Sequence, residues 1–268
     1  MPDIALVLLA AYVSLGLVVG FLAGLLGVGG GLIIVPLLIM QFHAQGLAVG
    51  LEPQLALGTS LATIVFTSFS SVRVHHQHGA VAWPLVRRLG AGAIVGTLLG
   101  AMLAAHVPAA VLKVFFVVFL FYAALQMWLD FKPAPHREPP GVAGATLAGS
   151  VIGAVSSWVG IGGGTLSVPY LLWHHVPMHR AIATSSAIGF PIALAGAVGY
   201  MLAGRGLAGL PEGSVGLIYL PALAGIVVGS VFTAPLGART THRLPVRRLK
   251  RVFALLLLVL GVRMALTL

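Results

Sequence analysis

The sequence contains no cysteine, only five acidic residues, and few charged residues of either sign. The absence of cysteine excludes disulfides, thiolate metal sites and cysteine nucleophiles. Charged residues make up 7% of the 268 positions, against roughly 25% in a soluble domain. Because a chain this poor in charge cannot cover a surface that faces water, a soluble globular fold is excluded.

Long apolar runs take the place of charge. Hydrophobic residues make up 59% of the chain, its mean hydropathy is +1.07, and runs of about 20 residues match the hydrocarbon core of a bilayer. The net charge of +10 sits in connectors beside these runs, where basic residues orient a protein in the membrane and meet anionic headgroups. We therefore predict an all-α polytopic membrane protein that has the lipid bilayer as a partner and does not bind nucleic acid.

The apolar runs fall into two groups of five, separated by a polar, proline-rich stretch at 130–141. Each group has one long run, a glycine-rich break, a short run and three further spans. The organisation predicted from this order is repeat one at 1–130, a linker at 131–141 and repeat two at 142–268. The ten runs are 4–26, 32–42, 53–72, 83–105, 108–129, 142–159, 165–173, 181–203, 214–238 and 252–268.

Three sequence matches between the two groups indicate an internal duplication. GVGGGLIIVP at 27–36 aligns with GIGGGTLSVP at 160–169, with six of ten positions identical. Because the three matches occur in the same order, chance is a poor explanation. The other two pairs are Thr59 and Ser60 with Thr184 and Ser185, and PAAVLKVFF at 108–116 with PVRRLKRVF at 245–253.

The basic residues predict that the two repeats have opposite orientations. In repeat one they gather around Arg73, Arg87 and Arg88, and in repeat two they gather one connector later, at 239–251. Basic connectors remain in the cytoplasm, which places both connectors and the linker inside and both chain ends on the periplasmic side. The predicted fold is two inverted-topology repeats, each a glycine-broken helix pair plus three transmembrane helices.

The two short runs predict a site for an anion. They are too short to span a bilayer, and a half-helix that begins after glycines exposes unpaired N–H groups with about half a positive charge. Broken helices at matching positions of inverted halves mark the binding site of many transporters. A competing interpretation is that the hydroxyls bond their own backbone or allow close helix packing. The predicted substrate-binding residues are Gly29, Gly30, Gly31, Thr59, Ser60, Gly162, Gly163, Gly164, Thr165, Thr184, Ser185 and Ser186.

These motifs resemble the sulfite exporter TauE/SafE family of membrane permeases. The likeness runs essentially end to end and includes GVGGG with its later VP, the Thr–Ser pair, GAVAW at 79–83 and RLPVRRLKRVFALLLL at 243–258. The resemblance implies a bacterial inner-membrane carrier for sulfite, a sulfonate or a related small anion. It also implies that the glycine-rich positions of the family fall on 29–31 and 162–164.

The position of the acids and histidines bears on what drives transport. All five acids and all ten histidines lie at the ends of spans or in connectors, so the sequence lacks the carboxylate within the membrane that a proton relay needs. No cofactor or metal is expected. An anion that leaves a cell with a negative interior gains about 2.3 kcal/mol per charge per 100 mV. The hypothesis is anion export driven by the membrane potential and the anion gradient.

Two alternatives stay open at this point. A passive anion channel would use the same helix ends, although paired broken helices favour alternating access. An intramembrane enzyme is the rival from another class. No histidine is followed by glutamate, so the H-E-x-x-H pair of a metalloprotease is absent. A serine–histidine pair is disfavoured because every histidine is interfacial, and we expect no enzymatic activity.

Overall fold

The computed structural model describes residues 2–26, 30–129, 141–241 and 246–266, and within these ranges the chain forms ten α-helices. The predicted all-helical class is confirmed, and six of the helices are long and apolar enough to cross a membrane. The helices are α1 Pro2–Leu26, α2 Gly31–Ala44, α3 Glu52–Gln77, α4 Trp83–Ala104, α5 Ala109–Leu129, α6 Val142–Val159, α7 Gly164–Trp173, α8 Met178–Ala203, α9 Leu220–Thr241 and α10 Val246–Ala265.

The helix boundaries differ from the predicted runs mainly at α9 and α10. Helix α9 begins at Leu220 rather than at 214, because the preceding residues form a turn in which the Leu220 N–H bonds the Gly213 carbonyl. Helix α10 begins at Val246 rather than at 252, because its basic first turns consist of good helix formers that an apolar run does not include. Hydropathy thus located the apolar middle of these helices better than their ends.

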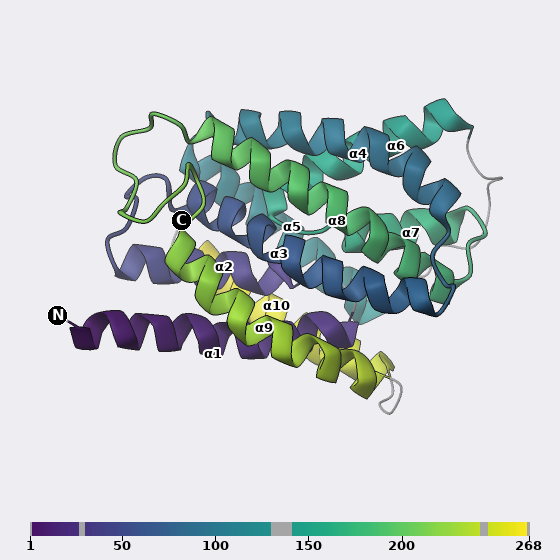
Figure 1. Cartoon of the computed structure of the whole chain (residues 1–268), viewed down its shortest axis with the longest axis horizontal. Coiled ribbons are helices and arrows are strands. Elements are labelled where there is room, and N and C mark those ends of the chain that lie inside the picture. Colours follow the sequence, from purple (N-terminus) through teal and green to yellow (C-terminus); the bar gives the residue numbers. More distant parts are fainter. Residues whose placement is uncertain (1, 27–29, 130–140, 242–245, 267–268) are drawn as a thin grey trace.

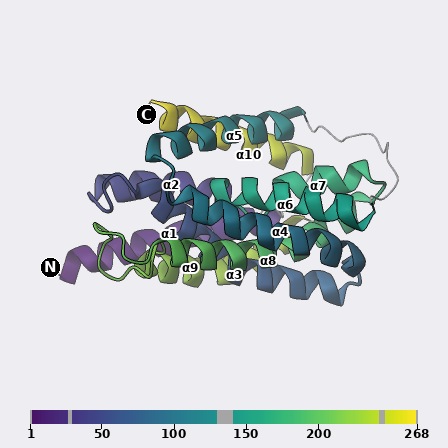
Figure 2. The same ribbon diagram turned by 90° about the horizontal axis from the view of Figure 1, so that it is seen from above.

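The two groups of five helices are interleaved. Helix α1 packs against α9, α4 against α6, α3 against α8 and α5 against α10, so each of these pairs joins one group to the other. Helix α1 begins and α10 ends at one end of the bundle, whereas α7 and the connection between α3 and α4 lie at the opposite end (Figures 1 and 2). We call the latter the linker end, because α5 ends there and α6 begins there.

Glycines allow the backbones of two helix pairs to approach closely, as small residues spaced four apart do in membranes. In both pairs a Cβ atom on any of these glycines would clash with the partner helix, with its backbone in every case except Gly225, where it would meet the Cβ atom of Tyr12. The sequence therefore specifies which faces of these four helices meet. The glycines are Gly16 and Gly20 of α1 against Gly225 and Gly229 of α9, and Gly92 and Gly96 of α4 against Gly149 and Gly153 of α6.

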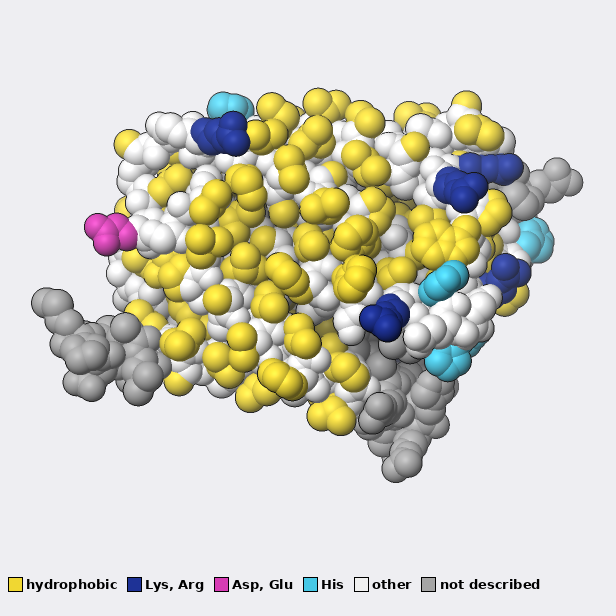
Figure 3. Space-filling view, viewed as in Figure 1, with side chains coloured by type: hydrophobic (Ala, Val, Ile, Leu, Met, Phe, Trp, Pro, Cys, Tyr) yellow, Lys and Arg dark blue, Asp and Glu magenta, His cyan; other side chains and the backbone are white. Residues whose placement is uncertain are grey.

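The surface has an apolar belt between two polar ends (Figure 3). Large hydrophobic side chains are exposed along the helices, including Leu147, Phe232 and Val259. Each charged side chain that the structure describes lies in a connector or within the first or last two turns of a helix. This distribution fits a protein that is surrounded by lipid along its length and by water at both ends.

Candidate functional site

The start of α7 is set by a glycine in the left-handed conformation. Gly163 is its N-cap residue with φ 76°, a conformation that side chains with a Cβ rarely adopt. The Gly163 carbonyl accepts hydrogen bonds from the N–H groups of Leu166 at 3.1 Å and Ser167 at 2.8 Å. The N–H groups of Gly164 and Thr165 therefore precede the first bond of the helix. Residues 160–165 are all buried, so this helix end lies inside the bundle.

The start of α2 has the same backbone geometry. Gly30 is its N-cap residue with φ 70°, and its carbonyl accepts from the N–H groups of Ile33 at 3.0 Å and Ile34 at 3.1 Å. The N–H groups of Gly31 and Leu32 correspond to those of Gly164 and Thr165. The predicted site residue Gly29 lies outside the described residues.

The two breaks meet in the interior of the bundle. Gly31, the first residue of α2, lies so close to Gly160 that a Cβ atom on it would clash with the Gly160 carbonyl oxygen. Gly160 ends α6 in the left-handed conformation, with φ 67°. From this meeting point α2 and α7 run toward opposite ends of the bundle (Figure 1). The sequence predicted two half-helices, and the structure places the start of α2 against the break that precedes α7.

Serines of α3 and α8 bond to the second break. The Ser60 hydroxyl donates to the Gly160 carbonyl at 2.8 Å. The Ser167 hydroxyl donates to the Gly163 carbonyl at 2.8 Å and lies 2.7 Å from the Ser185 hydroxyl. Because the single proton of Ser167 is used on Gly163, Ser185 is the donor to Ser167. The predicted residues Ser60 and Ser185 thus lie beside the break and help to hold its shape.

The matched threonines Thr59 and Thr184 each bond to the start of a helix in the other group. Thr59 accepts at 3.0 Å from the N–H of Tyr219, which directly precedes α9. Thr184 accepts at 3.0 Å from the N–H of Ala82, the N-cap residue of α4. These contacts satisfy orphan N–H groups at helix starts. They fit the structural interpretation of these two hydroxyls.

Two further predicted residues are Gly162, which directly precedes the N-cap residue of α7, and Ser186 of α8. Gly162 packs against α8, where a Cβ atom on Gly162 would lie 3.6 Å from the Cα atom of Gly189. The Ser186 hydroxyl donates to the Ile182 carbonyl of its own helix at 3.0 Å. Ser186 is therefore engaged with its own backbone, as serine commonly is within helices.

Two hydroxyls beside the break escaped the sequence analysis, those of Thr97 in α4 and Ser156 in α6. A Cβ atom on Gly163 would lie 3.5 Å from the Ser156 hydroxyl oxygen, and one on Gly153 would lie 2.6 Å from that of Thr97. The signal available was the four-residue glycine spacing of α4 and α6, which predicts close packing of small-residue faces. That spacing does not reveal which helices pair.

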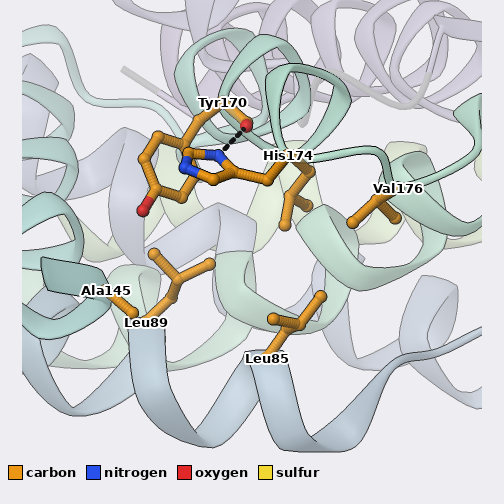
Figure 4. Close-up of a pocket in the computed structure, with 7 residues that line it drawn as sticks. Leu85, Leu89, Ala145, Tyr170, His174 and Val176 are labelled. Atoms are coloured by element: carbon orange, nitrogen blue, oxygen red, sulfur yellow. Dashed lines mark hydrogen bonds between the residues drawn. The ribbon is translucent and has the colours of Figure 1, made fainter. Parts of the chain in front are cut away.

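A small cavity lies farther along α7, toward the linker end. Its volume is about 40 Å³, room for one or two water molecules. Figure 4 shows Leu85 and Leu89 of α4 facing the rings of Tyr170 and His174 across it. The His174 ring is buried and its Nδ1 lies 2.8 Å from the Tyr170 carbonyl oxygen. The other lining residues are apolar, so the rings of Tyr170 and His174 carry the polar side-chain atoms that border this cavity.

Ten helices in the described part of the chain, an apolar belt and two half-helices that start inside the bundle are features of polytopic membrane permeases. The chain belongs to the sulfite exporter TauE/SafE family, whose pattern matches residues 12–264. The resemblance seen in the sequence motifs is thereby confirmed over nearly the whole chain.

Similar proteins occur in bacteria and archaea. A "probable membrane transporter protein" of Haemophilus influenzae is 36% identical over 250 residues, which cover 93% of this chain and 95% of that protein. A probable membrane transporter protein of Bacillus subtilis, YunE, is 29% identical over 93% of this chain and 94% of its own length. One of Methanocaldococcus jannaschii is 26% identical over 97% of both chains. No solved structure matches this chain at a significant level.

Proposed function

We propose that this permease is a secondary transporter that exports a small anion, sulfite or an organosulfonate, across the bacterial inner membrane. The observation that carries the proposal is the buried start of α7, where the N–H groups of Gly164 and Thr165 precede the first helical hydrogen bond. Such a helix end binds anions through oriented N–H groups and a partial positive charge. The family description and the names of the relatives support transport, and the sulfur chemistry rests on the family description alone.

The packing pattern supports two inverted repeats with boundaries at 1–130 and 142–268, joined by the linker at 131–141. In the two groups of five helices, α1 corresponds to α6 and α4 corresponds to α9. The α1–α9 pair therefore corresponds to the α6–α4 pair, and both pairs are observed. The same correspondence maps α3–α8 and α5–α10 onto themselves. Inverted repeats around paired broken helices are the architecture of alternating access.

The burial of the break favours a carrier over a passive channel. Residues 160–165 and 30–36 are all buried, so neither helix start is open to the bundle surface. An anion reaches this point only when helices move apart, as in a carrier. A channel that conducts at rest would keep a wet path to the same N–H groups.

We propose that the linker end faces the cytoplasm and that α1 begins and α10 ends at the periplasmic side. The described basic residues at the linker end outnumber those at the other end, in keeping with the positive-inside rule. The negative interior of the cell drives an anion from the cytoplasmic linker end toward the periplasmic side. The residues at the linker end are Arg73, Arg87, Arg88, Arg180, Lys250 and Arg251, against Lys113, Arg205 and Arg263 at the other.

The test is flux of sulfite, sulfoacetate, sulfate and chloride in liposomes that contain the purified protein, with the membrane potential set by a potassium gradient and valinomycin. We expect saturable sulfite or sulfonate flux that increases when the potential drives anions out of the lumen. Protein-free liposomes give the background. Anion flux that does not depend on the membrane potential but follows a proton gradient would contradict transport driven by the potential. Folded protein that transports none of the anions would contradict the proposed function.

A further inference from the structure

Three buried hydroxyl groups in one part of the bundle have no hydrogen-bond partner among the residues that the structure describes. They belong to Thr97 of α4, Ser156 of α6 and Thr165 of α7. The first two residues are 0% exposed and Thr165 is 5% exposed. Buried polar side chains are nearly always paired, so each exception requires a cause, and a missing ligand or water is one of the few available.

Ser156 and Thr165 both lie at the start of α7. Thr165 is the second residue of this helix, and the Ser156 hydroxyl oxygen lies 3.5 Å from where a Cβ atom on Gly163 would be. Because Gly163 has no side chain, no side-chain atom of this N-cap residue lies between the Ser156 hydroxyl and the start of α7. The N–H groups of Gly164 and Thr165 are at the same place. The hydroxyls of Ser156 and Thr165, which have no partner among the described residues, therefore adjoin N–H groups that precede the first bond of the helix.

Thr97 lies about one helical turn away. Its hydroxyl oxygen is 2.6 Å from where a Cβ atom on Gly153 would be, and Gly153 precedes Ser156 by three residues in α6. On α8, Gly196 contacts the Thr97 methyl group, and Ile192, one turn earlier, contacts Gly163. Gly153 lies one turn before Ser156 on α6, whereas Gly196 lies one turn after Ile192 on α8, so both neighbouring helices place Thr97 within about one turn of Gly163. The hydroxyls of α4, α6 and α7 border one region.

This region contains donors but no described side chain with a positive charge. The described charged side chains lie near helix ends and in connectors, and the other neighbours of Gly163 are Ile152 and Ile192. The helix end supplies only about half a positive charge. In such an apolar setting the cost of burying charge rises steeply with its magnitude, because no counter-ion offsets it.

We infer that Thr97, Ser156 and Thr165 form a hydroxyl subsite that binds a singly charged oxoanion, such as an alkanesulfonate or hydrogen sulfite, in preference to a doubly charged one. This inference rests on the proposed function, which it deepens by naming the charge of the substrate. The three hydroxyls donate to the oxygen atoms of the anion, and the half-helix offsets one negative charge. A dianion such as sulfate has similar size and oxygens but leaves a second charge unbalanced.

The first test compares methanesulfonate with sulfate in liposomes that contain the wild-type protein, at the same potential and pH. We expect methanesulfonate to move at least about tenfold faster. Equal rates for the two anions, or faster sulfate, would overturn the inference and leave the proposed function standing. Transport of neither anion nor of sulfite would overturn the proposed function and the inference with it.

The second test removes the hydroxyls. Thr97→Val and Ser156→Ala should each raise the KM for methanesulfonate about tenfold, while the melting temperature stays the same or rises, because an unpaired buried group is lost. Thr97→Ser, which keeps the hydroxyl, should restore transport. The matched control is Thr63→Val, since the Thr63 hydroxyl is buried but already donates to the Thr59 carbonyl at 2.9 Å. An unchanged KM in both hydroxyl-free variants would overturn the subsite.

Discussion

Helices α2 and α7 begin in the same way, at a glycine with positive φ, and both contain an interior proline at the matched positions Pro36 and Pro169. Their side chains differ. Where α7 has Thr165 and Ser167, α2 has Leu32 and Ile34, which are buried in the main hydrophobic core. The duplicated backbone thus presents hydroxyls on one side of the meeting point and hydrocarbon on the other.

The difference between the side chains of α2 and α7 suggests different roles for the two broken helices, core packing for α2 and substrate binding for α7. Both breaks provide a helix start inside the membrane, where the N–H groups need a partner. Only α7 adds hydroxyls to its N–H groups, and the unpaired hydroxyls of α4 and α6 lie beside α7. The comparison shows that α2 packs the hydrophobic core and supports the proposal that α7 is the half-helix that binds substrate.

The two ends of the bundle differ in a related way. Aligning the two glycine motifs places Ala145 of α6 opposite Tyr12 of α1. The buried Tyr12 ring packs edge-on against Tyr219, with ring centroids 6.3 Å apart, whereas Ala145 borders the cavity next to Tyr170 and His174. A large residue fills this position in α1, and a small one leaves room for the cavity beside α6.

The largest expected effect is on stability, at the pair Ile34 and Ser167. Ile34→Ala removes a core side chain and should lower the free energy of unfolding by about 2–5 kcal/mol. Ser167→Ala removes two hydrogen bonds, the one to the Gly163 carbonyl and the one from the Ser185 hydroxyl, and should cost less, about 1–3 kcal/mol. Thermal unfolding in detergent measures both. Equal losses would show that α2 and α7 do not differ in the way proposed.

A smaller and symmetric effect is expected at Thr59 and Thr184. Thr59→Val and Thr184→Val each leave a buried backbone N–H group without its acceptor, which should cost about 1–3 kcal/mol of stability in either variant. The substrate KM should change little in the protein that remains folded. A KM that rises in one variant without loss of stability would instead assign that threonine to substrate binding.

The third prediction compares the two cap glycines by transport. Gly30→Ala and Gly163→Ala each force a side chain into the left-handed region, at a cost of about 1–2 kcal/mol, so their melting temperatures should fall alike. Methanesulfonate flux should fall about tenfold, or ~1.4 kcal/mol, in Gly163→Ala alone. The reason is that its new methyl group would press on Ile192 and lie 3.5 Å from the Ser156 hydroxyl oxygen, whereas that of Gly30→Ala meets Val19 and Ala23. Parallel losses of flux would contradict the assignment to α7.

The sequence predicted the helices and the two breaks because hydropathy and glycine spacing are local signals. It placed the start of α9 too early, since hydropathy did not reveal the turn that ends at Tyr219. It could not identify Thr97 or Ser156, because their significance depends on the packing of α4 against α6 and on the absence of partners. The contacts of Thr59 and Thr184 with the opposite group were hidden for the same reason.

The most direct test of substrate binding at α7 uses the absence of cysteine from the chain. Thr165→Cys introduces one thiol at the start of α7, and Leu32→Cys introduces one at the matched position of α2. Each variant is labelled with a maleimide in liposomes, under a potential that drives transport, with and without methanesulfonate. We predict that methanesulfonate slows labelling of Thr165→Cys in proportion to its occupancy and leaves Leu32→Cys unaffected. Equal protection at both positions, or protection at neither, would contradict binding at the start of α7.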